Sequence, residues 1–175
     1  IEKETLMKHL NTIPAHKGDV FFITPGTVHA IGAGALIAEI QESSNVTYRL
    51  YDYGRRDKNG ELRELHIDKA IQVLNYKKSD SVRQPMSVLR YKPGCARELL
   101  SNCEYFRVER MLLNGSTTKE VTELSFEVLM CIDGTVKICS GGTELEIKKG
   151  NTVFIPAGSG TITVSGKSEM LMIRC

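Results

Sequence analysis

Short apolar runs separated by glycine and proline turns recur along the chain, and this pattern predicts a mainly β protein. In the first half, the run Val20–Ile23 is closed by the turn sequence Thr24-Pro25-Gly26. Alternating and apolar segments then predict three further strands, over residues 28–31, 35–41 and 46–53.

Two segments have helical spacing instead. Leu6, His9 and Leu10 recur at helical intervals within residues 2–11, and apolar positions recur in the same way within residues 66–76. The polar stretch 77–85, which ends at a proline, is expected to connect two parts of the chain.

The second half contains many short apolar segments of similar length. Strands are predicted over residues 105–113, 125–132, 135–140, 145–148, 152–155, 160–165 and 169–174. The expected turns between them contain Asn114-Gly115, Asp133-Gly134, Gly141-Gly142 and Ser165-Gly166. Regular short strands of this kind are typical of a sandwich, barrel or jelly roll.

An internal repeat refines this fold class. Residues 17–26 align without a gap with residues 149–158, and both copies read as a glycine turn, a buried strand and a second turn. The pattern is typical of one motif of cupin barrels, and two copies indicate two related barrels. We therefore expect cupin-type jelly-roll barrels with a few short helices. Residues 1–80 would be the C-terminal part of a catalytic cupin, and residues 86–175 a smaller cupin-like domain without metal ligands.

Composition limits the classes of binding partner and the cellular compartment that we expect for this protein. With 23 basic and 21 acidic residues, the net charge of +2 gives no general reason to expect nucleic acid or an anionic membrane as a partner. No apolar run is long enough to span a bilayer. Five cysteines without a CxxC pair predict reduced thiols in the cytoplasm. The basic cluster Arg55, Arg56 and Lys58 fits either a small phosphorylated ligand or a solvated turn.

Three residues of the first half are candidates for chemistry. His29 follows the Pro25-Gly26 turn, and the repeat places it opposite Thr161, so a metal-type ligand occurs only in the first copy. Glu39 lies on an expected strand, where it faces either solvent or a polar barrel interior. Arg49 is either an exposed edge residue or a guanidinium in the barrel mouth, where it would hold a phosphate or stabilise an enediolate.

Three dense motifs contain these candidates. Residues 25–32 read PGTVHAIG, residues 39–41 read EIQ, and residues 47–55 read TYRLYDYGR. Together they resemble the type I mannose-6-phosphate isomerases in their short bacterial form, over about forty residues with matching spacing. The remainder of the chain agrees more loosely.

The resemblance implies a role for each candidate. His29 would be one ligand of a catalytic zinc ion, Arg49 an active-site residue, and Glu39 a substrate-binding residue in the same pocket. Zinc would act as a Lewis acid while a proton moves between C1 and C2 of a sugar phosphate through a cis-enediol, interconverting mannose 6-phosphate and fructose 6-phosphate.

A catalytic zinc usually has three protein ligands and one open position. The family supplies the others from segments upstream of the PGTVHA motif, which are not found before His29 here. The chain begins at Ile1 without an initiator methionine, and we expect a C-terminal portion whose partner is the missing N-terminal half of the same enzyme. Alone, it is expected to bind zinc poorly and to have little activity.

The sequence also fits other function classes. A non-catalytic cupin that binds a sugar or sugar phosphate would use Arg49 and Glu39 as ligand contacts and would need no metal. Another cupin isomerase or epimerase would act on nucleotide sugars or on glucose 6-phosphate. A cupin oxygenase would need a cluster of histidines, whereas His29 stands alone.

Overall fold

The computed structural model describes residues 5–77 and 82–175. Far more of these residues lie in strands than in helices, which confirms the mainly β prediction. The chain divides into two compact units, Ile1–Gln84 and Pro85–Cys175. Within the described residues, no helix has the length and apolar character needed to cross a membrane.

The first unit contains two short helices. The 3-10 helix η1 spans Leu6–His9, and α1 spans Ile67–Val73, inside the predicted range 66–76. Ala70 of α1 is buried, whereas Ile71 and Val73 are about half exposed. The apolar stripe of α1 is therefore only partly covered by the residues around it, although such a stripe normally packs against a core. The predicted helix over residues 2–11 also includes residues 2–4, which lie outside the described residues.

The strands expected between residues 20 and 53 are not formed, so these predictions were wrong. The described part of the first unit has two isolated bridges, Phe21 with Arg83 and Arg56 with Leu62. A strand needs a neighbour that pairs its backbone N–H and C=O groups, whatever its own side-chain pattern. Residues 20–22 find such a neighbour in residues 82–84: Phe22 N donates to Val82 O (3.0 Å), and Gln84 N donates to Val20 O (2.7 Å).

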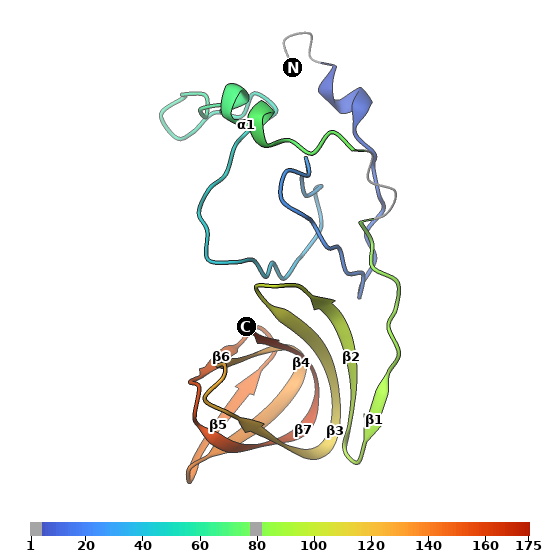
Figure 1. The fold of residues 1–175 in the computed structure, drawn as a ribbon, viewed down its shortest axis with the longest axis vertical. Helices are drawn as coiled ribbons and strands as arrows, with labels where there is room; N and C mark the ends of the chain where they lie inside the picture. The colour runs from blue at the N-terminus through green and yellow to red at the C-terminus, as the bar shows by residue number, and fades with distance from the viewer. Residues whose placement is uncertain (1–4, 78–81) are drawn as a thin grey trace. The chain divides into compact units, whose positions relative to one another are not determined.

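The second unit is one antiparallel sheet that curls around its own core (Figure 1). The strands run in the order β1-β2-β3-β7-β4-β5, and β6 pairs with β4. Their bounds are Arg90–Lys92 (β1), Cys95–Asn102 (β2), Arg107–Val121 (β3), Glu127–Ser140 (β4), Thr143–Lys148 (β5), Thr152–Ile155 (β6) and Gly160–Arg174 (β7). The two longest strands, β3 and β7, pair along their whole length, from Arg107 with Arg174 to Val121 with Gly160.

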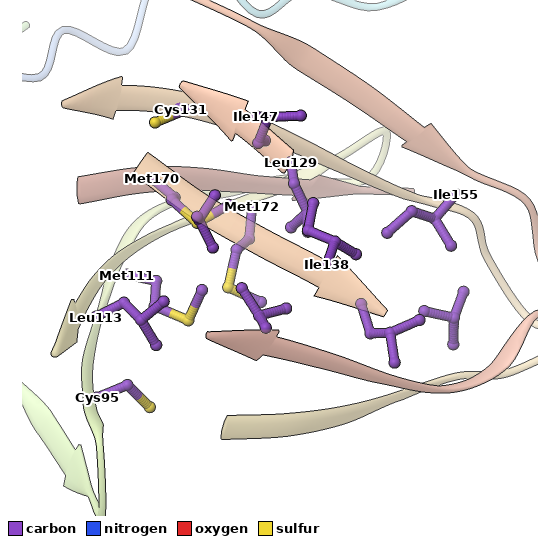
Figure 2. Packing of buried hydrophobic residues seen from close by; sticks show 14 residues of the cluster. Cys95, Met111, Leu113, Leu129, Cys131, Ile138, Ile147, Ile155, Met170 and Met172 are labelled. Carbon is purple, nitrogen blue, oxygen red and sulfur yellow. The ribbon is translucent and has the colours of Figure 1, made fainter. Parts of the chain in front are cut away.

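The core consists of side chains from the inner face of this sheet. Met111, Leu129, Ile162 and Met170 are at most 1% exposed. Figure 2 shows Met111, Met170 and Met172 close to one another, with Leu129, Ile138 and Ile155 further along the interior. Such burial of apolar area is the main stabilising term of the unit. Methionine suits it because its flexible chain fills irregular space.

Three of the four glycine turns predicted in this unit lie within continuous strands. Gly115 is inside β3, Gly134 inside β4 and Gly166 inside β7, each with a positive φ of 84–137°. Gly115 and Gly166 are partners across β3 and β7, and β4 has a register shift between Cys131 and Asp133. The glycines therefore allow long strands to bend or bulge. Only Gly141-Gly142 connects two strands, β4 and β5.

Gly134→Ala is expected to destabilise the second unit strongly. A Cβ at residue 134 would fall against the Lys167 carbonyl oxygen and 2.9 Å from the Ser168 Cα, both on the neighbouring strand β7. Overpacking of this kind costs about 1–3 kcal/mol. Gly142→Ala is the matched control, since its φ is also positive (82°) but a Cβ there meets no atom within 4 Å. Urea unfolding followed by circular dichroism compares them, and equal losses of stability would contradict the proposed clash.

The internal repeat is visible in the backbone. Gly18 and Gly150 have φ angles of 89° and 87°, and Gly26 and Gly158 have 80° and 75°. Between these turns, the second copy forms β6, which pairs with β4, whereas the first copy contributes one bridge at Phe21. Both copies thus form the same turns, and the strand exists where a partner strand is present.

Candidate functional site

His29 lies on an exposed loop, and its imidazole has a defined hydrogen bond. Its Nδ1 atom is 2.9 Å from the carbonyl oxygen of Thr27. Because a carbonyl oxygen only accepts, Nδ1 is the protonated nitrogen, and the lone pair of the neutral ring is on Nε2. Histidines that bind metals commonly donate their second N–H to a carbonyl or carboxylate in this way. The loop therefore presents Nε2 in the form that a metal requires.

The turn before His29 is tied to the end of α1. Asn75 N donates a hydrogen bond to Gly26 O (2.9 Å), and a Cβ at residue 26 would lie 2.5 Å from Val73 O. With its positive φ and this close approach, residue 26 favours glycine on two grounds. The Pro25-Gly26 turn thus holds the loop that carries His29 against the end of α1.

Asp52 is the centre of a group of arginines, which we call the Asp52 cluster: Asp52, Arg49, Arg55 and Arg63. Asp52 is 6% exposed, and its Oδ1 atom lies 2.5 Å from Arg55 Nη2, 3.4 Å from Arg63 Nη1 and 4.0 Å from Arg49 Nε. Three guanidinium groups share one carboxylate, so positive charge is in excess. Such a group suits a phosphate or an oxyanion, which guanidinium recognises through charged hydrogen bonds.

Arg49 is held from several sides. Its Nη1 donates to Glu64 O (3.0 Å), its backbone N donates to His66 Nδ1 (3.1 Å), and its carbonyl accepts from His66 N (2.7 Å). Its side chain is 21% exposed, whereas those of Arg55 and Arg63 are 61% and 45% exposed. Arg49 is therefore the best-fixed cation of the Asp52 cluster, as a residue that positions a reacting group should be.

Glu39 and His29 are less constrained than Arg49. Glu39 is exposed, and it makes no hydrogen bond or ion pair with any residue in the described ranges 5–77 and 82–175. The same ranges contain no hydrogen bond or ion pair that joins His29, Glu39 and Arg49 to one another. The structure thus ties Arg49 to Asp52 and His66 and leaves the other two candidates on exposed segments.

Sequence reasoning missed two members of this region. His66 lies outside the three motifs, and it accepts a hydrogen bond from the backbone N of Arg49 and precedes α1. Arg63 contacts Asp52 from eleven positions further along the chain, and no local pattern marks it. Arg56, by contrast, donates to Gly60 O (2.7 Å) in the turn that contains Lys58, as a solvated turn residue does.

The described residues do not fit a complete zinc site. Among residues 5–77 and 82–175, no group of three or more His, Cys, Asp or Glu side chains is placed to hold a metal ion. A catalytic zinc needs about three such ligands. His29 is suited to be one ligand, and the described part of the chain does not supply the others.

Both halves of the chain resemble known proteins. Residues 96–175 match the family "Mannose-6-phosphate isomerase, cupin domain". The chain is 34% identical to mannose-6-phosphate isomerase ManA of Bacillus subtilis over 98% of its length and 54% of that protein. It is 33% identical to the Streptococcus mutans enzyme over 84% of its length and 45% of that protein. The chain thus spans about half the length of these relatives.

A solved structure agrees with the sequence relatives. The crystal structure of the mannose 6-phosphate isomerase from Bacillus subtilis superposes with a TM-score of 0.65 at 28% identity, covering 74% of this chain and 40% of that one. With the family match, this confirms the predicted cupin fold. It also confirms the resemblance that the three motifs indicate.

Proposed function

This chain is a relative of the mannose-6-phosphate isomerases, with residues 96–175 in the family of their cupin domain, and from that premise we propose that it is part of an enzyme that interconverts mannose 6-phosphate and fructose 6-phosphate. The reaction moves a proton between C1 and C2 through a cis-enediol. Negative charge develops on the enediolate oxygens, so fixed positive charge nearby lowers the barrier.

The Asp52 cluster carries this proposal. Its three guanidinium groups around one buried carboxylate give the excess positive charge that a sugar phosphate or an enediolate requires. We assign the catalytic role to Arg49, because the contacts with Asp52, Glu64 and His66 hold it in place before substrate arrives. Glu39 is proposed as a substrate-binding residue that accepts hydrogen bonds from sugar hydroxyls.

His29 is proposed as one ligand of a zinc ion whose other ligands come from outside this chain. The Nδ1–H contact with Thr27 O leaves Nε2 available, which supports that role. When bound, zinc would polarise sugar oxygens as a Lewis acid. Because the described part of this chain offers one candidate ligand and not a set, we route no step of the reaction through the metal.

We further propose that the missing N-terminal half of the same enzyme completes the catalytic barrel. Apolar side chains along the expected strands are open to solvent: Leu36 is 98% exposed, Val46 65% and Ile31 56%. Apolar residues on neighbouring segments would normally be covered by packing against a partner. The relatives' additional length is compatible with such a partner. The second unit is proposed to support the catalytic barrel by packing.

Cytoplasmic location belongs to the same proposal. All five cysteines are free thiols, and Cys95 and Cys131 are buried in the core of the second unit. Thiols of this kind persist in reducing compartments.

One test addresses both the isomerase proposal and its need for a second half. The 175-residue chain alone is expected to show no turnover of mannose 6-phosphate, with or without added zinc, because one ligand does not hold the ion. The polypeptide isolated from its native cell is expected to be heavier than 19.5 kDa and to show chelator-sensitive turnover. Chelator-sensitive turnover by the 175-residue chain alone would overturn the proposed need for a second half.

The runner-up function is a non-catalytic cupin that binds a sugar phosphate. It is favoured by the same Asp52 cluster, which needs no metal to attract a phosphate. A native polypeptide of about 19.5 kDa that binds mannose 6-phosphate without turnover would establish this alternative and exclude the isomerase.

A further inference from the structure

One end of the second unit's sheet carries charged side chains on its inner face. We call these six residues the barrel-end cluster: Arg97, Arg107, Glu109, Lys119, Glu127 and Arg174. They come from four strands, β2, β3, β4 and β7. The proposed isomerase chemistry uses none of them.

The strand register places them on the core side of the sheet. Arg97 is the partner of Met111, Glu109 of Met172, Lys119 of Ile162 and Glu127 of Ile155. Each of these four partners belongs to the buried core. Directly opposed residues of antiparallel strands point to the same face. These charged residues therefore lie on the inner face of the sheet, beyond the end of its apolar packing.

Positive charge exceeds negative charge in this cluster. Lys119 forms an ion pair with Glu127, and Arg107 Nη2 lies 2.8 Å from Glu109 Oε1. Arg97 and Arg174 remain beyond these two pairs. Arg107 and Arg174 are moreover direct partners across β3 and β7. Like charges in that position repel one another, so the arrangement is stabilised by an added anion.

The carboxyl group of Glu127 adds a second, independent signal. Glu127 is 2% exposed, and its Oε1 atom is buried without a hydrogen-bond partner among the described residues. A buried carboxylate oxygen without a donor is costly. A ligand hydroxyl group would satisfy Oε1. The ligand thus needs both negative charge and a donor.

The surroundings shift the pKa values of Lys119 and Glu109. Burial lowers the pKa of the Lys119 ammonium group; Arg174 and Arg97 lower it too, and Glu127 opposes the change. Burial raises the pKa of Glu109, but the hydrogen bond and charge of Arg107, with Arg97 and Lys119, bring it below its usual value. The neighbouring cations contribute to both directions, although burial is the largest cause for Lys119 and the pair with Arg107 the largest lowering cause for Glu109.

A hollow opens at this place. It has a volume of about 210 Å³, and Lys119, Glu127 and Arg174 contribute to its walls. Pockets for drug-sized ligands measure about 300–1,000 Å³, so this hollow suits a smaller molecule. Arg97 and Arg107 lie outside its walls, and each has a buried Nε atom without a hydrogen-bond partner in the described ranges. The walls themselves thus combine two cations, Lys119 and Arg174, with the acceptor Glu127.

We propose that the barrel-end cluster is a binding site for a small oxyanion that carries a hydroxyl group, of the class of monoprotonated phosphate or a phosphate monoester. The anionic oxygens accept from Arg174 and Lys119 in the walls of the hollow, Arg97 and Arg107 add positive charge beside it, and the hydroxyl group donates to Glu127 Oε1. This function lies within the second unit and does not depend on the isomerase proposal.

The test is a residue-resolved NMR titration of the 175-residue chain with inorganic phosphate at constant ionic strength. Saturable shifts are expected at the amides of Lys119, Glu127 and Arg174. Arg174→Gln is expected to weaken phosphate about tenfold, equivalent to about 1.4 kcal/mol. Arg97→Gln is the second variant, for use if Arg174→Gln alters the fold. Lys137→Gln, at an exposed pair with Glu144 outside the cluster, is the matched control and should leave affinity unchanged.

Further outcomes separate this site from other sources of phosphate binding. Sulfate, which lacks a hydroxyl group, should bind more weakly than phosphate near pH 6. Saturable shifts confined to Arg49 and Asp52 would overturn the proposal without affecting the isomerase proposal. Non-saturating shifts, equal affinity of the Arg174→Gln and Arg97→Gln variants with the wild type, or sulfate binding as tight as phosphate would each overturn it as well.

Discussion

Arg49→Gln is expected to lower kcat for mannose 6-phosphate isomerisation by about 10²–10³-fold in the native polypeptide, the loss seen when one preorganised charge-stabilising donor is removed. Glutamine keeps much of the side chain's reach but removes the cation. The developing enediolate then loses a charge that Asp52 and Glu64 hold in place. Steady-state kinetics with mannose 6-phosphate measure the change.

The separation of kcat from KM makes this prediction specific. Removal of a transition-state interaction lowers kcat and kcat/KM together, whereas removal of simple phosphate binding raises KM with kcat unchanged. Arg56→Gln is the matched control, because Arg56 donates to Gly60 O in a surface turn and not to Asp52. An unchanged kcat for Arg49→Gln would contradict the catalytic role. Circular dichroism of both variants verifies that the fold is retained.

Lys119→Met is expected to reduce the free energy of unfolding of the second unit by about 3 kcal/mol, the lower end of the range for breaking a buried ion pair. Methionine has a similar length but no charge. Glu127, with its side chain 3% exposed, would then lose its ion-pair partner in the interior. Urea unfolding followed by circular dichroism measures the loss.

A double variant separates the pair from simple packing. Lys119→Met with Glu127→Leu replaces the whole pair by apolar groups and is expected to recover most of the stability, because no unpaired charge is left buried. Lys137→Met is the control, since its pair with Glu144 has both side chains more than half exposed and should matter little. A double variant as unstable as Lys119→Met would contradict the electrostatic explanation.

His29 and His66 show which side-chain contacts a local sequence pattern can predict and which it cannot. The position of His29 after a Pro-Gly turn marks it as a candidate, and the structure adds the Nδ1 contact with Thr27 O. His66 has no such local sign, because its contact with Arg49 joins residues seventeen positions apart. Long-range pairings of this kind arise from the tertiary fold, and a window of neighbouring residues does not contain them.

Strand prediction succeeds in the second unit and fails in the first, and the reason is physical. Alternation and turn residues identify β6 with its bounds, Thr152–Ile155, because β4 lies beside it to complete the hydrogen bonds. The same pattern at Val20–Ile23 yields one bridge, since pairing requires a second strand that residues 20–23 do not themselves provide. Glycines at positions 115, 134 and 166 mark changes of backbone direction, and only the neighbouring strands decide that these are bends and not turns.

By itself, the sequence determined the mainly β cupin fold, the turns with positive φ and the resemblance to one enzyme family, because these depend on periodicity, glycine positions and dense local motifs. Only the tertiary structure decided which strands form, that Arg63 joins Arg49 and Arg55 at Asp52, and that six charged residues gather at one end of the second unit's core. Those features depend on contacts between distant segments, whose energies come from pairing, burial and charge in three dimensions.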